Sequence, residues 1–315
     1  MKASSISQTP FEGKALETLR NNFKGPLILP FDERYDPARA LYNGMIDRYP
    51  ALIAQCADEE DVATAIRYAR KHGILTAIRG GGHNGAGLGS CDGGLVIDLR
   101  LLKSIQVDHQ KRQVKVQAGC TQGEVDAATH PYGLAVPAGI ISSTGIAGLA
   151  LGGGHGYLSR KHGLTIDNLI EAELVLADGR KAKASEQENP DLFWAIRGGG
   201  GNFGAVTSFL FRAHPVHTVY AGPMFWPLEQ TREILSWYRG FQPGAPEELY
   251  GFPSIMKVPP APPFPETLHR QPVCAIVWCF SGDMERAEEA FREIREKYPP
   301  MLDATGPMPF PALQG

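Results

Sequence analysis

The sequence predicts an α+β protein built from two domains. Its 315 residues are enough for about two domains of ordinary size. A strand–helix–strand unit between residues 51 and 78 is typical of a sheet with parallel strands and a right-handed crossover. After His214 the composition changes, because the glycine runs stop and prolines become frequent. Two amphipathic helices with an apolar strand between them then predict a separate layer of helices on a sheet.

Composition and charge exclude several classes of protein. Apolar residues make up 43% and charged residues 21% of the chain, which is typical of a globular protein with a core. The net charge of −3, with no long basic run, argues against nucleic acid as a partner. No apolar leader opens the chain and no run approaches the about 20 apolar residues of a membrane span, so we expect neither secretion nor a membrane. The five cysteines have no CxxC spacing, which argues against zinc and disulfides and predicts reduced thiols in the cytoplasm.

The first part of the chain alternates apolar strands with one strong helix signal. Asp58 is a good N-cap, Asp61 lies in the first turn, and Gly73 is placed to end the helix between them. The elements expected up to residue 118 are a helix at 14–23 in an otherwise irregular segment 1–50, and strands at 51–56, 74–78, 94–99, 104–108 and 112–118.

The remaining elements follow from turn and cap signals. Asp178-Gly179 is a hairpin turn, Gly133 ends a helix, and Asn189 followed by Pro190 is placed to begin one. We expect helices at 121–132, 190–197, 229–241 and 284–298, strands at 169–177, 180–184, 205–212 and 273–280, and no element in the last residues, 305–315.

A glycine-rich loop between the strands at 74–78 and 94–99 is the strongest functional signal. Successive bare N–H groups form an anion nest, and His83 directly follows three glycines. The alternative is an ordinary loop with a histidine at the surface or in the core. A Rossmann fingerprint is excluded because Gly85, Gly87 and Gly89 lead into a strand rather than a helix. A Walker A loop is excluded because Gly-Lys-Ser/Thr is absent.

A second glycine-rich stretch, 134–169, repeats Gly-Gly-Gly-His at 152–155. Its small residues predict a backbone packed closely against a large flat ligand. The alternative is a helix that packs tightly through small residues. A third glycine cluster, 198–204, ends the helix at 190–197.

Five segments together resemble the FAD-linked oxidases of the vanillyl-alcohol-oxidase fold, the PCMH-type FAD-binding family. They are IRGGGHN (78–84), DGGLVIDL (92–99), AVPAGIISSTGIAGLALGGGHG (135–156), KHGLTIDNL (161–169) and FWAIRGGGGNFGAVT (193–207). Within this family the chain is most similar to berberine-bridge-enzyme-like and 6-hydroxynicotine-oxidase-like bacterial members. The resemblance implies an FAD-binding domain at 1–214, with its core at about 46–213, and a partial substrate domain at 215–315.

The resemblance also implies an FAD cofactor and its binding residues. The first loop would hold the pyrophosphate, and His83 would be bonded to the 8α-methyl group of the flavin. A second link through cysteine is not expected, because Ile141 holds that position and Cys120 is expected to be a buried thiol. His155 would face either the substrate or the protein interior. The cofactor-binding residues carried over are Arg79, Gly80, Gly81, Gly82, His83, Asn84, Gly87, Leu88, Pro137, Ala138, Gly139, Thr144, Gly145, Gly148, Gly153, Gly154, Gly156, Asn168 and Val206.

The function implied is an FAD-dependent oxidoreductase acting on a small molecule. A C–H next to a hydroxyl or amine would give hydride to flavin N5, and oxygen would reoxidise the flavin to yield hydrogen peroxide. Family members are longer, so the catalytic base is expected in a C-terminal region missing here; Tyr220, Tyr238 and Tyr250 have no motif to support them. The alternatives are a non-catalytic flavin-binding fragment and, more weakly, a nicotinamide-dependent dehydrogenase. Substrate, oligomeric state and the choice between oxidase and dehydrogenase stay open.

Overall fold

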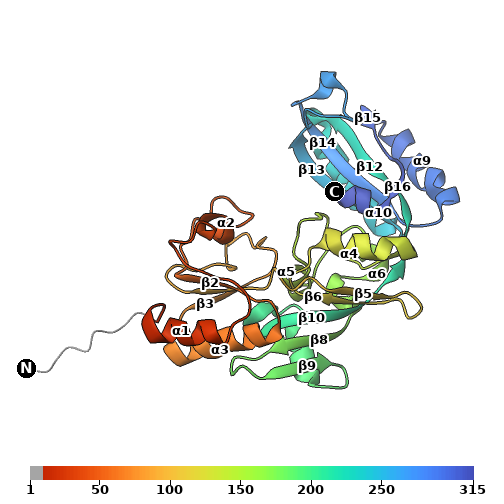
Figure 1. Cartoon of the computed structure of the whole chain (residues 1–315). Coiled ribbons are helices and arrows are strands. Elements are labelled where there is room, and N and C mark those ends of the chain that lie inside the picture. Colours follow the sequence, from red (N-terminus) through yellow and green to blue (C-terminus); the bar gives the residue numbers. More distant parts are fainter. Residues whose placement is uncertain (1–9) are drawn as a thin grey trace, which may run out of the picture.

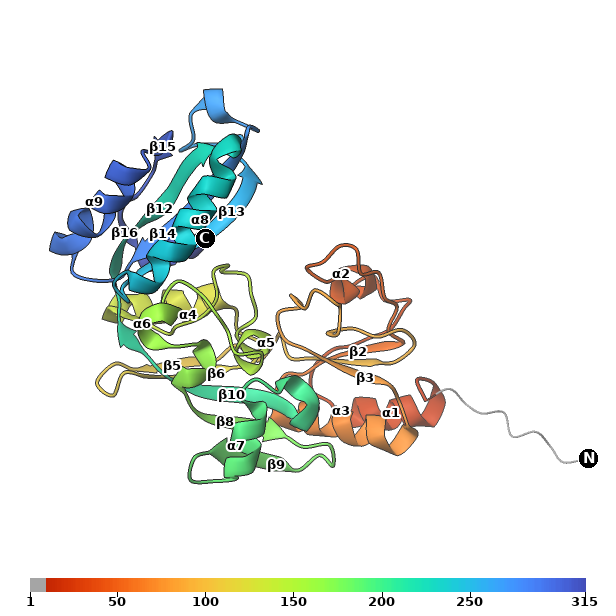
Figure 2. The ribbon, with the colours of Figure 1, turned by 180° about the vertical axis from the view of Figure 1, so that it is seen from behind.

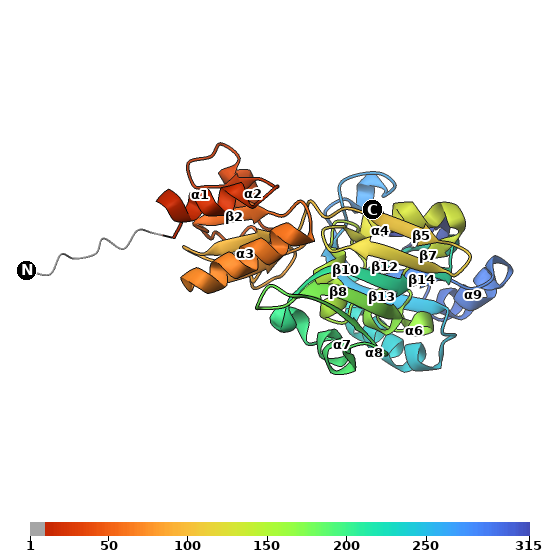
Figure 3. The ribbon, with the colours of Figure 1, turned by 60° about the horizontal axis from the view of Figure 1, so that its bottom comes forward.

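The computed structural model describes residues 10–315, so most of the N-terminal segment used above to argue against a leader lies outside it. In Figures 1 and 3 the residues up to about 100 form one lobe, and two five-stranded antiparallel sheets lie in the rest of the molecule, with β7 (Leu134–Ala135) and β11 (His214–Pro215) as a small separate antiparallel pair. The first lobe has a four-stranded sheet in the order β1-β2-β4-β3. Its elements are α1 (Gly13–Asn21), β1 (Leu27–Ile28), α2 (Tyr35–Arg39), β2 (Leu52–Gln55), α3 (Glu59–His72), β3 (Thr76–Arg79) and β4 (Leu95–Asp98).

The predicted strand–helix–strand unit is confirmed. Asp58 accepts hydrogen bonds from the N–H groups of Glu60 and Asp61, and Gly73 ends α3 in the left-handed region at φ 62°. Strands β2 and β3 are parallel, but β4 lies between them and pairs with both. The segment 1–50, expected to hold only one helix, also contains β1 and α2. Strand β1 escapes prediction because it is two residues long and exists through its pairing with β2.

The second sheet is antiparallel, in the order β5-β6-β10-β8-β9, and its predicted strands and helices are confirmed. The predicted cap of α7 is wrong in its chemistry, because the Asn189 amide donates to the Lys183 carbonyl oxygen and makes no cap hydrogen bond. The elements are β5 (Ile105–Asp108), β6 (Gln113–Gln117), α4 (Gln122–Thr129), η1 (His130–Tyr132), β7 (Leu134–Ala135), α5 (Ile146–Leu151), α6 (Ser159–His162), η2 (Thr165–Asn168), β8 (Leu169–Val175), β9 (Lys181–Ser185), α7 (Pro190–Ile196), η3 (Gly200–Phe203) and β10 (Ala205–Arg212).

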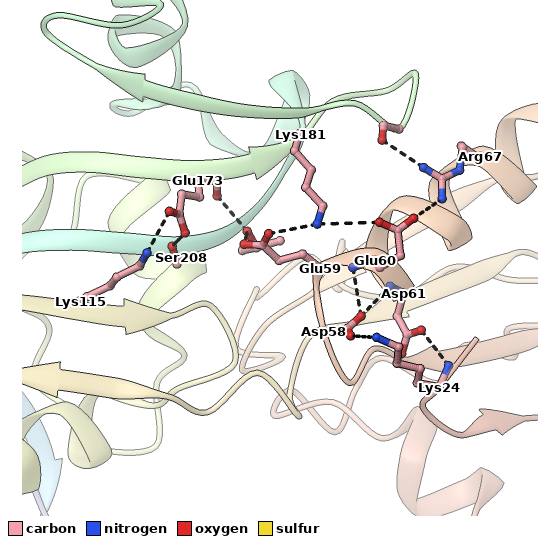
Figure 4. Close-up of polar contacts among 12 residues, drawn as sticks. Lys24, Asp58, Glu59, Glu60, Asp61, Arg67, Lys115, Glu173, Lys181 and Ser208 are labelled. Carbon is pink, nitrogen blue, oxygen red and sulfur yellow. Dashed lines mark hydrogen bonds and ion pairs between the residues drawn. The ribbon is translucent and has the colours of Figure 1, made fainter. Parts of the chain in front are cut away.

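The N-terminal end of α3 joins the first lobe to the second sheet (Figure 4). Glu59 accepts a hydrogen bond from the Thr207 hydroxyl on β10 at 2.9 Å. Asp61 is buried and accepts three backbone N–H bonds, from Lys24, Gly25 and Ala57. The Glu59 contact joins α3 to the second sheet, and the Asp61 contacts fix the start of the helix within the first lobe.

The last part of the chain has the two predicted helices and the predicted strand at 273–280. It also has strands that were not predicted, and the strands from residue 218 onward together form the third sheet. It has the order β13-β14-β12-β15, with β16 also paired to β12, and α8 and α9 lie on it (Figure 2). The elements are β11 (His214–Pro215), β12 (Thr218–Pro227), η4 (Leu228–Gln230), α8 (Thr231–Phe241), η5 (Gln242–Gly244), β13 (Leu249–Lys257), η6 (Glu266–Leu268), β14 (Pro272–Phe280), η7 (Met284–Arg286), α9 (Ala287–Lys297), β15 (Leu302–Asp303), β16 (Gly306–Pro309) and α10 (Phe310–Gln314).

The expectation that the last residues carry no element is wrong. Strand β16 pairs with β12, and α10 packs against α4. Phe310 is buried in a cluster with Val219 and Tyr250, and the Gln314 carbonyl oxygen accepts a hydrogen bond from the Ser142 N–H at 3.0 Å. Tertiary packing therefore stabilises a short helix that its own sequence does not signal.

Two histidine stacks hold the segment that connects the second sheet to the third. The His214 ring stacks on His162 with centroids 3.9 Å apart, and the His217 ring stacks on His130 at 4.2 Å. His214 Nε2 also lies 2.7 Å from the Asn168 side-chain oxygen. Each stack would bring two positive charges close together if both rings were protonated.

This arrangement predicts that low pH destabilises the protein through His162. Burial, His214 and Lys161 lower the pKa of His162 from 6.5 to about 4. The nearby Glu248 carboxylate acts in the opposite direction but does not outweigh them. The unfolded chain then binds more protons between those values, so stability contributed by neutral His162 is lost as pH falls from about 6.5 to 4.

The measurement is the melting temperature of the wild type and of His162→Gln at pH 7 and pH 5. Burial raises the pKa of Asp126 to about 7, so this carboxyl group stabilises the protein as pH falls, opposite to His162. Asp126 is present in both proteins, and the difference between their losses of stability therefore reports on His162. We expect His162→Gln to lose less stability at pH 5 than the wild type. A control variant, His109→Gln, changes an exposed ring in the β5–β6 turn and should behave as the wild type; equal losses in all three proteins would contradict the prediction.

Candidate functional site

The loop after β3 presents a row of backbone donors that the protein does not use. Within residues 10–315, none of the backbone N–H groups from Gly80 to Gly85 donates a hydrogen bond to a protein acceptor. The Asn84 side-chain oxygen instead accepts from the N–H groups of Ala86 and Leu88, at 3.1 and 3.0 Å, and so fixes the far end of the loop. Backbone donors seldom stay unpaired in a fold, so six in a row fit an anionic ligand.

A buried ion pair supports the loop from below. Arg79 and Asp98 lie opposite each other at the ends of β3 and β4, 2.8 Å apart, and are 1% and 0% exposed. Arg100 also binds Asp98, at 2.8 Å. Burial alone would raise the pKa of Asp98, but Arg100 and Arg79 hold that pKa below its usual value. The Arg79 side chain, predicted to bind the cofactor, therefore lies under the loop, where its carbons face Gly82 and Gly89.

The two glycine-rich stretches meet at Gly81 and Gly145. A Cβ atom on Gly81 would lie 2.4 Å from the Gly145 nitrogen, and one on Gly145 would lie 2.3 Å from the Gly81 nitrogen. Real Cβ atoms do not approach other atoms so closely, so both positions require glycine. The structure thus brings the first loop against the residues just before α5. Both segments were predicted to bind the same cofactor, and this contact would allow them to do so.

This contact places Thr144 and Ser143 beside His83. His83 Nδ1 lies 3.5 Å from the Thr144 hydroxyl, and Nε2 lies 3.3 Å from the Ser143 hydroxyl. The Tyr42 ring stacks on the imidazole with centroids 4.0 Å apart. Burial lowers the pKa of His83, although the Ser143 backbone favours the charged form. A lower pKa favours the neutral imidazole, which is the form that can act as a nucleophile.

Most other predicted residues of the second stretch pack within the protein. A Cβ on Gly156 would lie 2.0 Å from the Ala138 carbonyl oxygen, and one on Gly154 would meet the Thr165 side chain. The Gly139 carbonyl oxygen accepts from the buried Gln122 amide at 3.0 Å. Gly148 differs, because it is exposed on α5 and a Cβ there would meet nothing within 4 Å. By contrast, Pro137, Ala138 and Gly153 are buried. The alternative of tight packing through small residues thus explains much of this stretch, and only a minority of the predicted binding residues face open space.

Asn168 and Val206 are also explained by contacts inside the protein. The Asn168 amide donates to the carbonyl oxygens of His162 and Leu164, both at 2.9 Å, and its oxygen faces His214. Val206 is buried in the main hydrophobic cluster. In the first loop, Gly87 packs on Ile46, while Leu88 is exposed.

A cavity of about 810 Å³ lies along the free edge of β3. Thr76 and Ile78 line it on one side, and η3 and the start of β10 line it on the other. Its walls thus come from both lobes. Arg70 and Arg180 add positive charge to its lining.

The third sheet approaches the second glycine stretch through Tyr250. Its phenol lies 3.5 Å from His155 Nδ1, and its ring meets the Tyr157 ring edge-on at 6.0 Å. Burial raises the pKa of Tyr250 to about 12. Tyr220 and Tyr238, which the sequence analysis considered together with Tyr250, make hydrogen bonds elsewhere. Tyr220 donates to Glu288, and Tyr238 donates to the Gly251 carbonyl oxygen. His155 itself is exposed.

Sequence reasoning missed two of the residues that surround His83. Tyr42 lies in a segment expected to be irregular, and no periodicity marks it. Ser143 lies inside a quoted motif but carried no role there. No group of three His, Cys, Asp or Glu side chains within the described part of the chain could hold a metal ion.

Comparisons with known proteins show similarity in both sequence and fold. Residues 50–185 match the family described as FAD binding domain. (R)-6-hydroxynicotine oxidase of Paenarthrobacter nicotinovorans is 40% identical over 186 residues, which cover 59% of this chain and 41% of that protein. The solved xylooligosaccharide oxidase of Myceliophthora thermophila C1 has a TM-score of 0.81 at 26% identity over 95% of this chain and 62% of that one. The solved BBE-like 1 variant of Physcomitrella patens has a TM-score of 0.80 at 27% identity, over 93% and 62%.

These matches confirm the predicted PCMH-type FAD-binding fold. The resemblance of the chain to 6-hydroxynicotine oxidase and to BBE-like proteins, predicted from its motifs, is confirmed by the same matches. The chain spans about half or less of the length of the curated relatives it matches, from 41% to 52% for the first four.

The contact between the loops predicts that Gly145→Ala disrupts the site. The new methyl group would push the Gly81 backbone away, and overpacking of this kind costs about 1–3 kcal/mol of stability or more. We expect a melting temperature several degrees lower, measured by circular dichroism. Gly148→Ala is the matched control: it adds a methyl group three residues along into open space, and alanine favours the helix by about 0.5–1 kcal/mol. A Gly145→Ala protein as stable as Gly148→Ala would contradict the geometry.

Proposed function

We propose that the first loop binds the pyrophosphate of FAD through its free backbone donors. The observation that carries this proposal is the row of unpaired N–H groups from Gly80 to Gly85, next to the His83 imidazole. The buried Arg79 adds positive charge beneath the loop. The cofactor-binding set predicted from the family is proposed with it, with His83, Thr144 and Gly148 as the members that line the open side.

We propose that His83 carries a single covalent bond to the flavin. Ile141, where many relatives would supply a cysteine, has no nucleophile, and its side chain is 42% exposed. Cys120 is buried, and burial raises its pKa to about 11, so its thiol is unreactive at neutral pH. All five cysteines are buried.

We infer that the adenosine end of FAD occupies the cavity beside β3. That cavity starts on the strand that leads into the loop, and both lobes line it. A flat ligand could enter between Ile78 on one wall and Ala205 on the other. Val206 would then support the cavity from the core side rather than touch the cofactor.

The reaction proposed is the oxidation of a small molecule at a C–H next to a hydroxyl or an amine. When bound, the flavin supplies the hydride acceptor at N5 and the electrons that reduce oxygen to hydrogen peroxide. The chain positions that group through residues 1–214, and residues 215–315 supply part of the substrate side, where Tyr250 meets His155. The relatives named as oxidases of hydroxynicotine and xylooligosaccharides support this donor class.

We propose a cytoplasmic protein without nucleic-acid or membrane partners. The mild negative charge and the buried thiols support this location. Of the helices in residues 10–315, none combines the length and apolar character that crossing a bilayer demands.

The test is acid precipitation of the expressed chain, followed by mass analysis of its peptides. We expect yellow colour in the pellet and the mass of FAD on the peptide that contains His83. His83→Ala should release all of its flavin into the supernatant while still binding it before precipitation. Free FAD from the wild type would refute the covalent bond alone. Absence of flavin from both fractions would refute FAD binding by this chain.

Flavin binding without turnover would support the alternative of a non-catalytic flavoprotein. The measurement is hydrogen peroxide release with a panel of sugars, secondary alcohols and cyclic amines. We expect at least one class to reduce the bound flavin.

A further inference from the structure

Four buried oxygen atoms on α4 and α10 have no hydrogen-bond donor within residues 10–315. They are Gln122 Oε1, both carboxyl oxygens of Asp126, and Gln314 Oε1. The three residues are 0%, 2% and 5% exposed, so bulk water does not reach these atoms freely. Buried polar atoms are nearly always paired in folded proteins, and each of these acceptors therefore calls for a partner.

The fold brings the three residues together. Gln122 and Asp126 are one helical turn apart on α4, so their side chains lie on the same face of that helix. Helix α10 packs against α4 (Figure 1), and Ser142 joins the two helices. Its carbonyl oxygen accepts from the Gly123 N–H at 2.8 Å, and its N–H donates to the Gln314 carbonyl oxygen at 3.0 Å. Gln314 is therefore tied to the first turn of α4, where Gln122 lies.

The unpaired atoms are all acceptors, and the one formal charge among them is negative. The Gln122 amide nitrogen donates to the Gly139 carbonyl oxygen at 3.0 Å, which leaves Oε1 as the free end of that side chain. Burial alone raises the pKa of Asp126 to about 7, and no basic side chain within the described residues offsets that effect. His130, one turn further along the chain, stacks on His217.

A proton satisfies only part of this group. Protonated Asp126 has one O–H donor, which pairs with one acceptor, so two of the four oxygens would stay unpaired. A cation can be shared by all four, because hard cations take carboxylate, amide and backbone oxygens as ligands. One carboxylate balances one positive charge, whereas a divalent ion would leave excess charge buried in the protein.

We propose that Gln122, Asp126 and Gln314 hold a monovalent cation, Na⁺ or K⁺, between α4 and α10. The bound ion stabilises the packing of α10 on α4. It also stabilises the segment before α5, because the Gln122 N–H donates to the Thr144 carbonyl oxygen at 2.8 Å. None of the three ligand residues is assigned to the flavin, so this inference does not rest on the proposed function.

The test compares the melting temperature of the protein in NaCl, KCl and choline chloride at one concentration. The protein is first dialysed into choline chloride at pH 8, where most Asp126 is ionised. Choline is too large to enter a buried site, so it serves as the reference. We expect Na⁺ or K⁺ to raise the melting temperature by about 2–5 °C over choline, because an ion that binds only the folded state stabilises it by mass action.

Three variants locate the ion. Asp126→Asn keeps the shape of the side chain and removes its charge, and we expect it to melt at the same temperature in all three salts. Gln314→Met removes one oxygen ligand and should need a severalfold higher ion concentration for half of the rise, which tests the site even if Asp126→Asn does not fold. Asp191→Asn is the matched control, because it changes an exposed carboxyl on α7 and should keep the whole wild-type rise.

Equal melting temperatures of the wild type in the three salts would overturn the inference. A rise that persists unchanged in Asp126→Asn and Gln314→Met would place the ion elsewhere and overturn this site. A rise that appears only when CaCl₂ is added to the choline sample would overturn the assignment to a monovalent ion. All of these outcomes are independent of flavin binding, which acid precipitation tests separately.

Discussion

The close approach of Gly81 to Gly145 is the constraint on which the site depends. The two residues belong to loops from different sheets, and each backbone occupies the space where the other residue's Cβ would be. No side chain can hold these loops apart. As a result, residues 60 positions apart in the sequence, His83 and Ser143, come within hydrogen-bonding distance. The chemistry assigned to the histidine is therefore a consequence of backbone packing.

The loop can keep its N–H groups unpaired because other groups hold its shape. Asn84 closes one end, and the Arg79–Asp98 pair lies beneath the other. A buried ion pair adds little net stability, because desolvation of both charges offsets much of their attraction. Loss of either partner would leave an unpaired charge in the core, so the pair favours one arrangement of β3 and β4 over others. The contacts of α3 with β10 then fix that arrangement against the second sheet (Figure 4).

Local signals in the sequence were sufficient for the loop and for the strands of the first two sheets other than β1, but not for the third sheet. Asp58, Gly73 and the glycine run carry their conformation in their residue types, so α3 and the loop could be predicted. The sequence of strand β12 contains Gly222 and Pro223, which are unfavourable in a strand, and the strand is stabilised by β14 and β16, which lie far along the chain. The Arg79–Asp98 pair could not be predicted, because the sequence analysis did not pair the strands at 74–78 and 94–99, and the structure shows that β3 and β4 lie side by side. Tyr42 could not be predicted either, since only the tertiary fold brings it to His83.

A family motif and a binding site are not the same set of residues. Gly156, Gly154 and Asn168 lie in the quoted motifs, yet each has a packing or hydrogen-bonding role inside the protein that accounts for its residue type. The groups with an open side are fewer: the N–H groups of residues 80–85, the His83 ring, Thr144 and Gly148. Glycine in such a motif thus serves two purposes, because some glycines let backbones meet and others leave room for a ligand. In this protein the close backbone contact is a condition for binding, since the two loops must touch before their free N–H groups and the imidazole can face one ligand.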